Sequence, residues 1–304
     1  MKPSAFVYHR PESLDEALEV LAEVGADGKV LAGGQSLLPI LNMRLAAPGH
    51  LVDVNRLTDL AYVRAEPDGV RVGALARHAA VERNEPAARV QPLLRQALRL
   101  VAHPTIRNRG TTVGSLAHAD PSGEMTAVLA VLGGQVTLAC TTGRRDVVAA
   151  DFFVGPLESA VAPGELAVEA FFPSAPPGSG TAFVEVARRH GDYAVCGVAA
   201  AVAPSDGQDV DRDGAGRSVD VRLGYVSMGP TPAVARLAGV APDGPGGAPG
   251  SWAGIAGDAI AGLDPEDDIH ATAEYRLHLA RVLTARALAA AWSSSGVTTS
   301  GVAA

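Results

Sequence analysis

Two short stretches of the chain combine residue types that suit the binding of a phosphate-like anion. In the first, Val30-Leu31-Ala32 leads into Gly33-Gly34-Gln35-Ser36, and in the second, Arg107-Asn108-Arg109-Gly110 leads into Thr111-Thr112-Val113-Gly114-Ser115. Glycine lacks a Cβ and tolerates positive φ, so its backbone can approach a ligand closely. Successive N–H groups in such turns can form a concave anion site. We expect the first turn (residues 32–36) and the second turn (residues 109–115) to hold one diphosphate together.

The first turn matches neither of two common phosphate-binding motifs. A Rossmann motif needs G-x-G-x-x-G and an acidic residue about 20 positions further on. Asp53 lies at that distance, but Gly33-Gly34 has no third glycine. A P-loop is excluded because no Gly-Lys-Ser or Gly-Lys-Thr follows. On this stretch alone, a plain structural turn remains an open alternative.

Composition narrows the class of protein. The 304 residues are 47% hydrophobic and 19% charged, which predicts a packed protein of two or three domains. A net charge of −8 argues against a nucleic-acid surface. No apolar run approaches the roughly 20 residues of a membrane helix, and the N-terminal residues lack an apolar leader. Only Cys140 and Cys196 are present, too few for an iron–sulfur cluster. We therefore expect a cytoplasmic protein with two free thiols. A disulfide between Cys140 and Cys196 is the alternative.

The elements that must position the first turn follow from local patterns. Ser13 and Glu16 fit a capping box, and Gly25 fits the end of the same helix. Beyond it, a strand at 30–32, a helix at 37–45 and a strand at 51–54 predict a strand–helix–strand unit with a parallel strand pair.

Further along the chain, the pattern changes to α+β with antiparallel pairs. Pro67-Asp68-Gly69 and Thr142-Gly143 each lie between alternating segments and predict hairpins. Strands are also predicted at 166–172, 183–187, 196–202 and 219–226, and helices at 92–102, from 127 onward and at 271–292. In the last helix, Tyr275 and Leu279 are assigned to the apolar face and Arg276 to the polar face. A mobile loop is expected at 206–216.

Composition also predicts the domain boundaries. The segment Ser174 to Gly180, rich in Pro, Gly and Ser, separates two domains. We predict one domain at 1–175, with lobes of about 1–55 and 56–175, a second at 176–292, and a flexible tail at 293–304.

Several motifs together resemble the FAD-binding medium subunit of molybdenum hydroxylases, the family of aerobic carbon monoxide dehydrogenase and of xanthine dehydrogenase flavoprotein subunits. The resemblance runs from Phe6 to about Ala291. The motifs that carry it are Phe6-x-Tyr8-x-x-Pro11-x-Ser13-Leu14, Ala32-Gly33-Gly34-Gln35-Ser36-Leu37-Leu38-Pro39, Ile106-Arg107-Asn108-Arg109-Gly110-Thr111, Ser115-Leu116-Ala117-His118-Ala119-Asp120-Pro121, Gly191-Asp192-Tyr193-Ala194 and Tyr275-Arg276.

This resemblance implies a fold and a cofactor. The fold is α+β: a two-lobed FAD-binding domain of the vanillyl-alcohol-oxidase (PCMH) type, followed by a smaller α+β domain with a helical end. FAD is expected to be noncovalent, although His103 and His118 are near enough to keep covalent attachment open. The site residues carried over are Ala32, Gly33, Gly34, Gln35, Ser36, Thr111, Gly114, Ser115, Glu124 and Tyr193. No catalytic or metal-binding residue is assigned.

Some positions keep a second interpretation. Glu124 is expected near ribose or ribityl hydroxyls, or else as a solvated carboxylate or a charge at the start of a helix. Tyr193 is expected near the isoalloxazine, or else in the core. His118 and Asp120 suggest a metal site, but too few ligands converge. Val113 stands where the family usually has glycine, and a positive φ there would strain a β-branched residue. Arg107 and Arg109 are left unassigned.

The same resemblance implies partners. In the family, substrate is oxidised at a molybdopterin centre on a large subunit, and two [2Fe–2S] clusters on a small subunit pass electrons to FAD. We expect this chain to relay those electrons to a terminal acceptor, within a dimer of heterotrimers. A stand-alone FAD oxidase and a flavin-free scaffold, caused by Val113, are the alternatives. The sequence names neither the substrate nor the acceptor.

Overall fold

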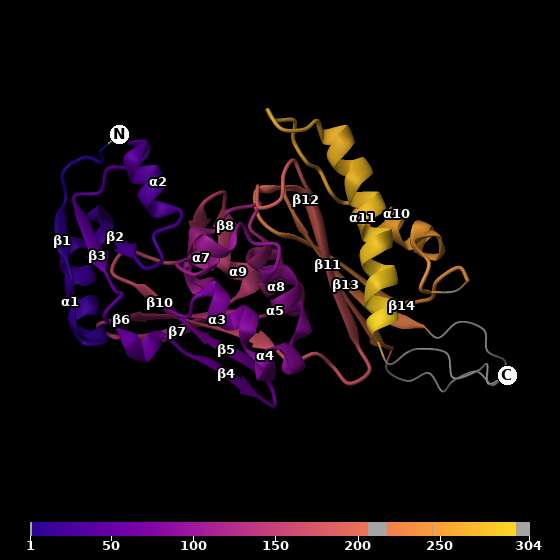
Figure 1. Ribbon diagram of the computed structural model, residues 1–304, viewed down its shortest axis with the longest axis horizontal. Helices are drawn as coiled ribbons and strands as arrows, with labels where there is room; N and C mark the ends of the chain where they lie inside the picture. Colours follow the sequence, from indigo (N-terminus) through magenta and orange to yellow (C-terminus); the bar gives the residue numbers. More distant parts are fainter. Residues whose placement is uncertain (1, 206–217, 245, 296–304) are drawn as a thin grey trace.

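The computed structural model describes residues 2–205, 218–244 and 246–295. Three larger sheets follow one another along the molecule, with the N-terminal lobe at one end and the C-terminal domain at the other (Figure 1). The predicted α+β class is confirmed. The loop predicted at 206–216, and residues 296–304 of the predicted tail, lie outside the described residues. Within those residues, no helix combines the length and apolar character needed to cross a membrane.

The N-terminal lobe is built on a parallel sheet of strand order β1-β3-β2. The pairing of β2 (Gly28–Leu31) with β3 (His50–Asp53) confirms the predicted parallel unit, and β1 (Val7–His9) pairs with the far side of β3. Helix α1 (Leu14–Val24) begins at Ser13, whose Oγ accepts from the Glu16 N–H at 3.1 Å. Helix α2 (Leu37–Asn42) follows the first turn and ends before the predicted residue 45.

The second lobe holds an antiparallel sheet of strand order β4-β5-β10-β6-β7, which confirms both predicted hairpins. Its strands are β4 (Val63–Glu66), β5 (Gly69–Gly73), β6 (Gln135–Cys140), β7 (Gly143–Val148) and β10 (Leu166–Pro173). Strand β10 joins two cores, because Leu166 and Val168 pack in the N-terminal lobe whereas Ala170 and Phe172 pack beneath the helices of the second lobe. The two lobes therefore form one packed unit rather than two separate units joined by a linker.

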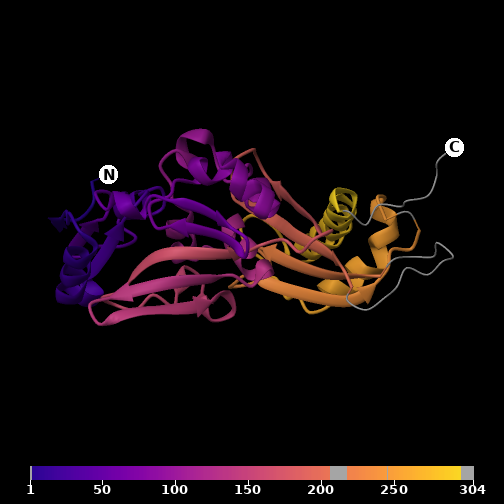
Figure 2. The ribbon, with the colours of Figure 1, turned by 90° about the horizontal axis from the view of Figure 1, so that it is seen from below.

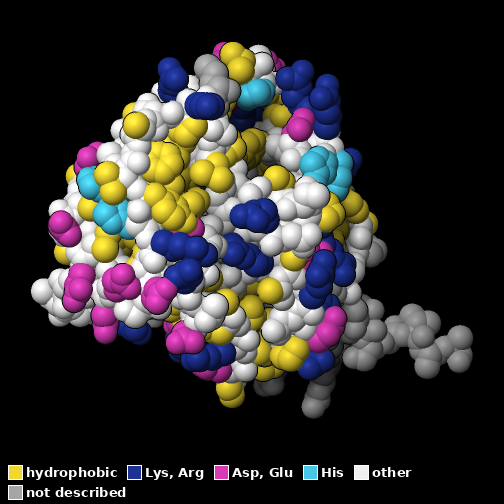
Figure 3. Space-filling view, turned by 60° about the vertical axis from the view of Figure 1, so that its left-hand side comes forward, with side chains coloured by type: hydrophobic (Ala, Val, Ile, Leu, Met, Phe, Trp, Pro, Cys, Tyr) yellow, Lys and Arg dark blue, Asp and Glu magenta, His cyan; other side chains and the backbone are white. Residues whose placement is uncertain are grey.

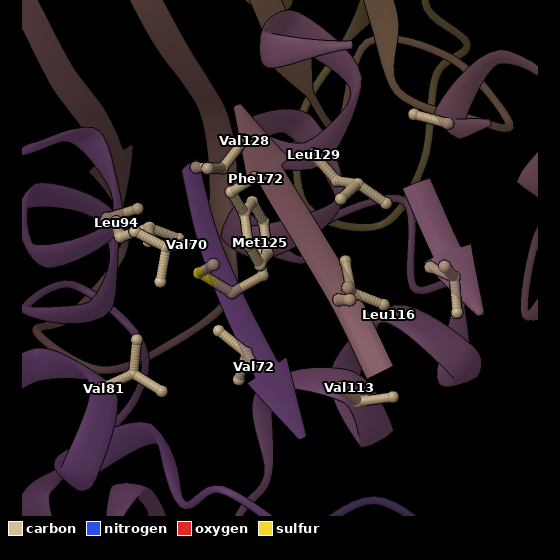
Figure 4. Close-up of a cluster of buried hydrophobic side chains, with 14 of the residues drawn as sticks. Val70, Val72, Val81, Leu94, Val113, Leu116, Met125, Val128, Leu129 and Phe172 are labelled. Carbon is tan, nitrogen blue, oxygen red and sulfur yellow. The ribbon is translucent and has the colours of Figure 1, made fainter. Parts of the chain in front are cut away.

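Short helices cover this sheet. They are α3 (His78–Arg83), α4 (Glu85–Val90), α5 (Pro92–Leu98), α6 (Pro104–Arg107), α7 (Thr112–His118), α8 (Glu124–Leu132) and α9 (Ala149–Phe152). Figure 4 shows the core they form, with Met125 of α8 among Val70, Val72 and Phe172 of the sheet. Two short strands, β8 (Phe153–Gly155) and β9 (Glu158–Ser159), pair beside α7. Burial of the apolar side chains of α7 in this core fixes the position of the helix. Because the second turn is the start of α7, the same burial fixes the position of that turn.

The C-terminal domain is a four-stranded antiparallel sheet between two helical layers (Figure 2). Its strands are β11 (Gly180–Ala187), β12 (Ala194–Pro204), β13 (Val219–Val226) and β14 (Ala233–Val240). Helix α8 packs on one face, and α10 (Ala253–Ile260) and α11 (Ala273–Ser294) pack on the other. The 3-10 turns are Gly25–Asp27, Thr58–Leu60 and Pro249–Trp252.

Helix α11 corrects the predicted faces. Arg276, assigned to the polar face, is 6% exposed, whereas Tyr275, assigned to the apolar face, is 49% exposed. Burial of a guanidinium is tolerated only where its donors are paired. Here Nη1 donates to the carbonyls of Val195 and Ser227, each at 2.9 Å, and Nη2 contacts Asp268 at 2.6 Å. Arg276 therefore anchors α11 to the ends of two strands.

Candidate functional site

The first turn connects the end of β2 to α2 and touches the second turn directly. Gly34 has φ 73°, a conformation that favours glycine. A Cβ built on Gly33 would lie 2.5 Å from the carbonyl oxygen of Arg109 and 2.7 Å from Cα of Gly110. No side chain fits in that space, so Gly33 is required by the approach of one backbone to another. The two turns, far apart in the sequence, are neighbours in the fold.

The first turn also carries N–H groups without a protein acceptor. Within the described residues, the backbone N–H groups of Gly33, Gly34, Gln35 and Ser36 donate to no other group. The Gln35 side chain instead folds back, and its Nε2 donates to the Gly33 carbonyl at 3.0 Å. Backbone donors rarely stay unpaired unless water or a ligand accepts from them. Consecutive backbone N–H groups without a protein acceptor can together bind an anion.

The second turn differs from its prediction as a glycine-rich bend, because helix α7 already begins at Thr112. Thr111 is its N-cap, with Oγ1 accepting from the Gly114 N–H at 3.2 Å, and the Ser115 N–H donates to the Thr111 carbonyl at 3.0 Å. Thus the N–H groups of Gly114 and Ser115 are used inside the helix. In the part of the chain that the structure describes, those of Thr111 and Val113 have no acceptor.

Val113 is not strained. It lies in the first turn of α7, outside the positions with positive φ, and its side chain is 1% exposed. Figure 4 shows it with Leu116 at the edge of the core. The strain expected for a β-branched residue here is therefore wrong, since the position needs ordinary helical dihedrals.

Two residues that sequence reasoning missed hold the turns together. The Asn55 Nδ2 donates to the Ala32 carbonyl at 2.8 Å, and Arg77 donates to the Asn55 Oδ1 and to the Arg109 carbonyl, each at 2.7 Å. A polar residue two positions after Asp53, at the carboxyl end of a parallel strand, was an available signal for Asn55. Nothing in the local sequence marks Arg77.

Glu124 is the first residue of α8 and is only 9% exposed. Burial, with the nearby charges of Glu185 and Asp120, raises its pKa to about 8. The interpretation as a solvated carboxylate is therefore wrong, whereas the position of Glu124 agrees with the alternative of a residue at the start of a helix. Glu185 of β11 is a second partly buried acid, and burial raises its pKa to about 7.

Tyr193 precedes β12 and is 65% exposed, so it is not a core residue. Loss of solvent at its hydroxyl, followed by the charge and hydrogen bond of Asp120, raises its pKa to about 12. Its ring is open while its hydroxyl lies toward the acidic groups. Such a ring offers a free aromatic face beside the FAD-binding domain.

The C-terminal domain contacts the segments of the FAD-binding domain that lie on either side of the second turn. Ser227 donates from its N–H to the Pro121 carbonyl at 2.9 Å and from Oγ to Ser122 Oγ at 2.8 Å. On the other side, Gly191 lies against the His103 ring, where a Cβ would be 2.6 Å from Cε1. These contacts hold the Tyr193 turn against His103, before the second turn, and against Pro121 and Ser122, after it. Figure 3 shows a face with a hollow near its middle, bordered by hydrophobic side chains and by Lys or Arg side chains.

Other candidate sites have structural explanations. No three His, Cys, Asp or Glu side chains among the described residues converge to hold a metal, so His118 and Asp120 form no such site there. Arg107 pairs with Glu82 at 2.9 Å and donates to two carbonyls, which explains it as a structural residue. Cys140 and Cys196 are both free thiols.

Comparison with known proteins agrees with this geometry. Residues 4–175 match the family described as FAD binding domain in molybdopterin dehydrogenase, and residues 181–291 match the CO dehydrogenase flavoprotein C-terminal domain. The chain is 39% identical over 291 residues to the 6-hydroxypseudooxynicotine dehydrogenase complex subunit alpha of Paenarthrobacter nicotinovorans, covering 96% of each chain.

Carbon monoxide dehydrogenase provides the structural comparison. The chain is 34% identical to the medium chain of the Hydrogenophaga pseudoflava enzyme, covering 96% of this chain and 99% of that one. A solved structure of the enzyme from that organism superposes with a TM-score of 0.87, at 33% identity, over 97% of this chain and 100% of the other. This chain therefore belongs to the family of FAD-binding medium subunits of molybdenum hydroxylases, which are subunits of oxidoreductase complexes.

Proposed function

We propose that the first turn and the start of α7 hold the diphosphate of one noncovalent FAD. The contact between Gly33 and Arg109-Gly110 carries this proposal, because it joins the turn that holds one set of free N–H groups to the segment that leads into the other set. Gly33, Gly34, Gln35 and Ser36 supply the first set, and Ala32, whose carbonyl accepts from Asn55, fixes the start of the turn. Thr111 and Val113 supply donors of the second set, while Gly114 and Ser115 form the helix start that fixes them.

The remaining site residues fit the rest of the cofactor. Glu124, buried at the start of α8, is suited to hydrogen bond with ribose or ribityl hydroxyls. Tyr193 offers an aromatic face to the isoalloxazine from the C-terminal domain. Bound FAD supplies the capacity to accept and release electrons. No residue of this chain is proposed as a catalyst of substrate oxidation.

We propose that the chain relays electrons from the [2Fe–2S] clusters of a small subunit to a terminal acceptor. Support comes from two relatives, one a subunit of a dehydrogenase complex and one a medium chain, and from a similar solved structure of a carbon monoxide dehydrogenase that lacks the Mo-pyranopterin moiety of its molybdenum cofactor. A molybdopterin-containing large subunit completes the expected assembly, a dimer of heterotrimers in the cytoplasm. We place the domain boundary at about residue 175 and the lobe boundary at about residue 55.

Purification of the full chain, alone and with its partners, tests this function. The chain should be yellow and should release about one FAD per polypeptide on acid denaturation, because the site is noncovalent. The complex should also contain molybdenum and iron, which would exclude a stand-alone oxidase. A colourless chain that does not take up added FAD would refute the proposal.

A further inference from the structure

We propose that Arg77 is a binding residue for the diphosphate and that Asn55 is a positioning residue for Arg77. This inference rests on the proposed function, because it names the positive charge that the diphosphate site uses. It adds a charged side chain to a site otherwise built from backbone N–H groups.

The first argument is geometric. Arg77 Nη1 donates to the Arg109 carbonyl at 2.7 Å, and Nη2 donates to Asn55 Oδ1 at 2.7 Å. Asn55 Nδ2 in turn donates to the Ala32 carbonyl at 2.8 Å. One guanidinium and one amide therefore connect the backbone of the first turn to that of the second. The guanidinium lies where the two turns meet.

The backbone around Arg77 fixes it in that place. Arg77 and Thr111 form an antiparallel bridge, in which the Thr112 N–H donates to the Ala76 carbonyl at 3.2 Å and the His78 N–H donates to the Gly110 carbonyl at 2.9 Å. Asn55 is fixed as well, since Asp53 Oδ1 accepts from its N–H at 2.9 Å and from its Nδ2 at 2.6 Å. Such a preorganised side chain loses little entropy when a ligand binds.

The second argument is charge. Both acceptors of Arg77 are neutral, and within the described residues no carboxylate lies within ion-pair distance of it; the negative charge on Asp53 acts on it without direct contact. Arg77 is half-buried, and Arg109 adds a second positive charge nearby. A partly buried cation without an anion in direct contact is costly unless a bound anion balances it. A diphosphate supplies that anion, and guanidinium is well suited to bind it.

The neighbouring histidine does not provide this charge. His78 is fully buried beside Thr112, with Nδ1 3.2 Å from Oγ1. Burial, together with the charge of Arg107, lowers the pKa of His78 to about 4, so its imidazole is neutral near pH 7. The positive charge in this region therefore comes from Arg77, which is half-buried, and from Arg109, which is exposed.

The test measures flavin and nucleotide binding to the apo full chain. Wild type should bind FAD, and ADP should displace it better than AMP or adenosine. Arg77→Gln should weaken FAD binding about 10- to 100-fold, the effect of losing a charge-assisted hydrogen bond. It should leave riboflavin binding unchanged and flatten the salt dependence of FAD binding. Arg281→Gln, at an exposed position on α11, is the matched control for charge loss.

Two further variants separate charge from positioning. Arg77→Lys should retain the salt dependence but lose affinity, because lysine cannot bridge two acceptors in the same plane. Asn55→Ala should weaken FAD binding less than Arg77→Gln and keep the salt dependence. If Arg77→Gln does not fold, a flattened salt dependence in Arg77→Lys would overturn the proposal.

The outcomes distinguish this inference from the proposed function. If wild type does not bind FAD and ADP does not compete, the proposed function fails. If wild type binds FAD but Arg77→Gln does so with the same affinity and salt dependence, only the role of Arg77 fails. Equal losses for FAD and riboflavin in Arg77→Gln would show a purely structural effect and would also overturn it.

Discussion

The two turns reach the same place by opposite designs. The first turn has a glycine at φ 73°, free N–H groups, and a following helix of only six residues. The second turn is the start of a helix whose cap, Thr111, and second residue, Val113, are both buried. Among the described residues, the N–H donors of residues 33–36 in the first turn have no protein acceptor. The second turn is packed, and most of its N–H donors bond to protein acceptors.

This difference assigns the turns different tasks. The second turn is fixed by core packing, so it retains its shape without a ligand. The first turn depends on contact with the second, through Gly33 against Arg109 and Gly110. We infer that the second turn is the rigid base and that the first turn is ordered against it. Variants in the first turn should therefore act mainly on binding, and variants in the second turn should act mainly on stability.

The largest effect is expected for Gly33→Val. Its side chain cannot fit where a Cβ alone would lie 2.5 Å from the Arg109 carbonyl, so the first turn must move away. FAD content, measured by visible absorbance after gel filtration, should fall from near one per chain to near zero.

Gly257→Val is the control, because a Cβ at Gly257 in α10 meets nothing within 4 Å. This variant should retain its FAD. Normal FAD content in Gly33→Val would contradict the contact between the turns.

Val113→Gly should have the next largest effect, on stability rather than binding. It removes a buried side chain and places glycine in a helix, a combined cost of roughly 2–3 kcal/mol. Urea unfolding should show this loss, while the affinity for FAD in native buffer stays near that of wild type. Ala290→Gly, at an exposed position of α11, measures the helix contribution alone and should cost about 1 kcal/mol. A gain in FAD affinity with no loss of stability would mean that valine distorts the second turn after all.

A third effect is pH dependence beyond the second turn, at Glu124. Its folded pKa of about 8 lies above the ordinary value of 4.5, so the folded state holds the proton more tightly. Its contribution to stability is complete below about pH 4.5 and is lost as pH rises toward 8. Glu124→Gln should therefore gain stability over wild type across this range, by about 1 kcal/mol per pH unit.

The measurement is urea unfolding of the apo chain from pH 6 to 8. Burial lowers the pKa of His78 to about 4, so His78 reduces stability only toward acid. Burial raises the pKa of Glu185 to about 7, and Glu185 is present in both proteins, so the quantity compared is the difference between Glu124→Gln and wild type at each pH. Glu274→Gln is the control, since Glu274 lies in the first turn of α11 but is exposed. A constant difference between Glu124→Gln and wild type would show that Glu124 is ionised in the folded chain.

Local patterns in the sequence predicted most of the fold. Ser13, Gly25 and the two hairpin turns were recognisable because their conformations depend on adjacent residues. Strand β14 was missed because the segment is rich in Ala, Gly and Arg and contains few β-branched or aromatic residues. Helix α7 was missed as well, because Gly, Ser and Thr near its start are typical of a loop.

The site was predictable only in part. The glycines of the first turn were visible, whereas Arg77 acts on Asn55 and Arg109, which are 22 and 32 residues away in the sequence. Arg276 was misassigned for the same reason, as its Nη1 and Nη2 donors are paired by distant carbonyls and Asp268. Burial of a charged residue is decided by partners that folding brings together. Local periodicity contains no information about them.

The smallest expected effect distinguishes the cap of the second turn from its role in binding. Thr111→Ala removes the Oγ1 that accepts from the Gly114 N–H and should cost about 1 kcal/mol of stability. It should also weaken FAD binding several-fold, because Thr111 directly follows Arg109 and Gly110, which contact Gly33 of the first turn. Thr111→Ser retains the acceptor and should restore both properties.

Thr272→Ala provides the matched comparison in the other domain. Thr272 caps α11 in the same way, with Oγ1 accepting from the Tyr275 N–H at 3.2 Å. Its loss should cost similar stability but leave FAD affinity unchanged, since α11 is remote from the turns. Equal FAD losses in Thr111→Ala and Thr272→Ala would mean that binding follows overall stability. The distinction between a rigid base and an open turn would then not hold.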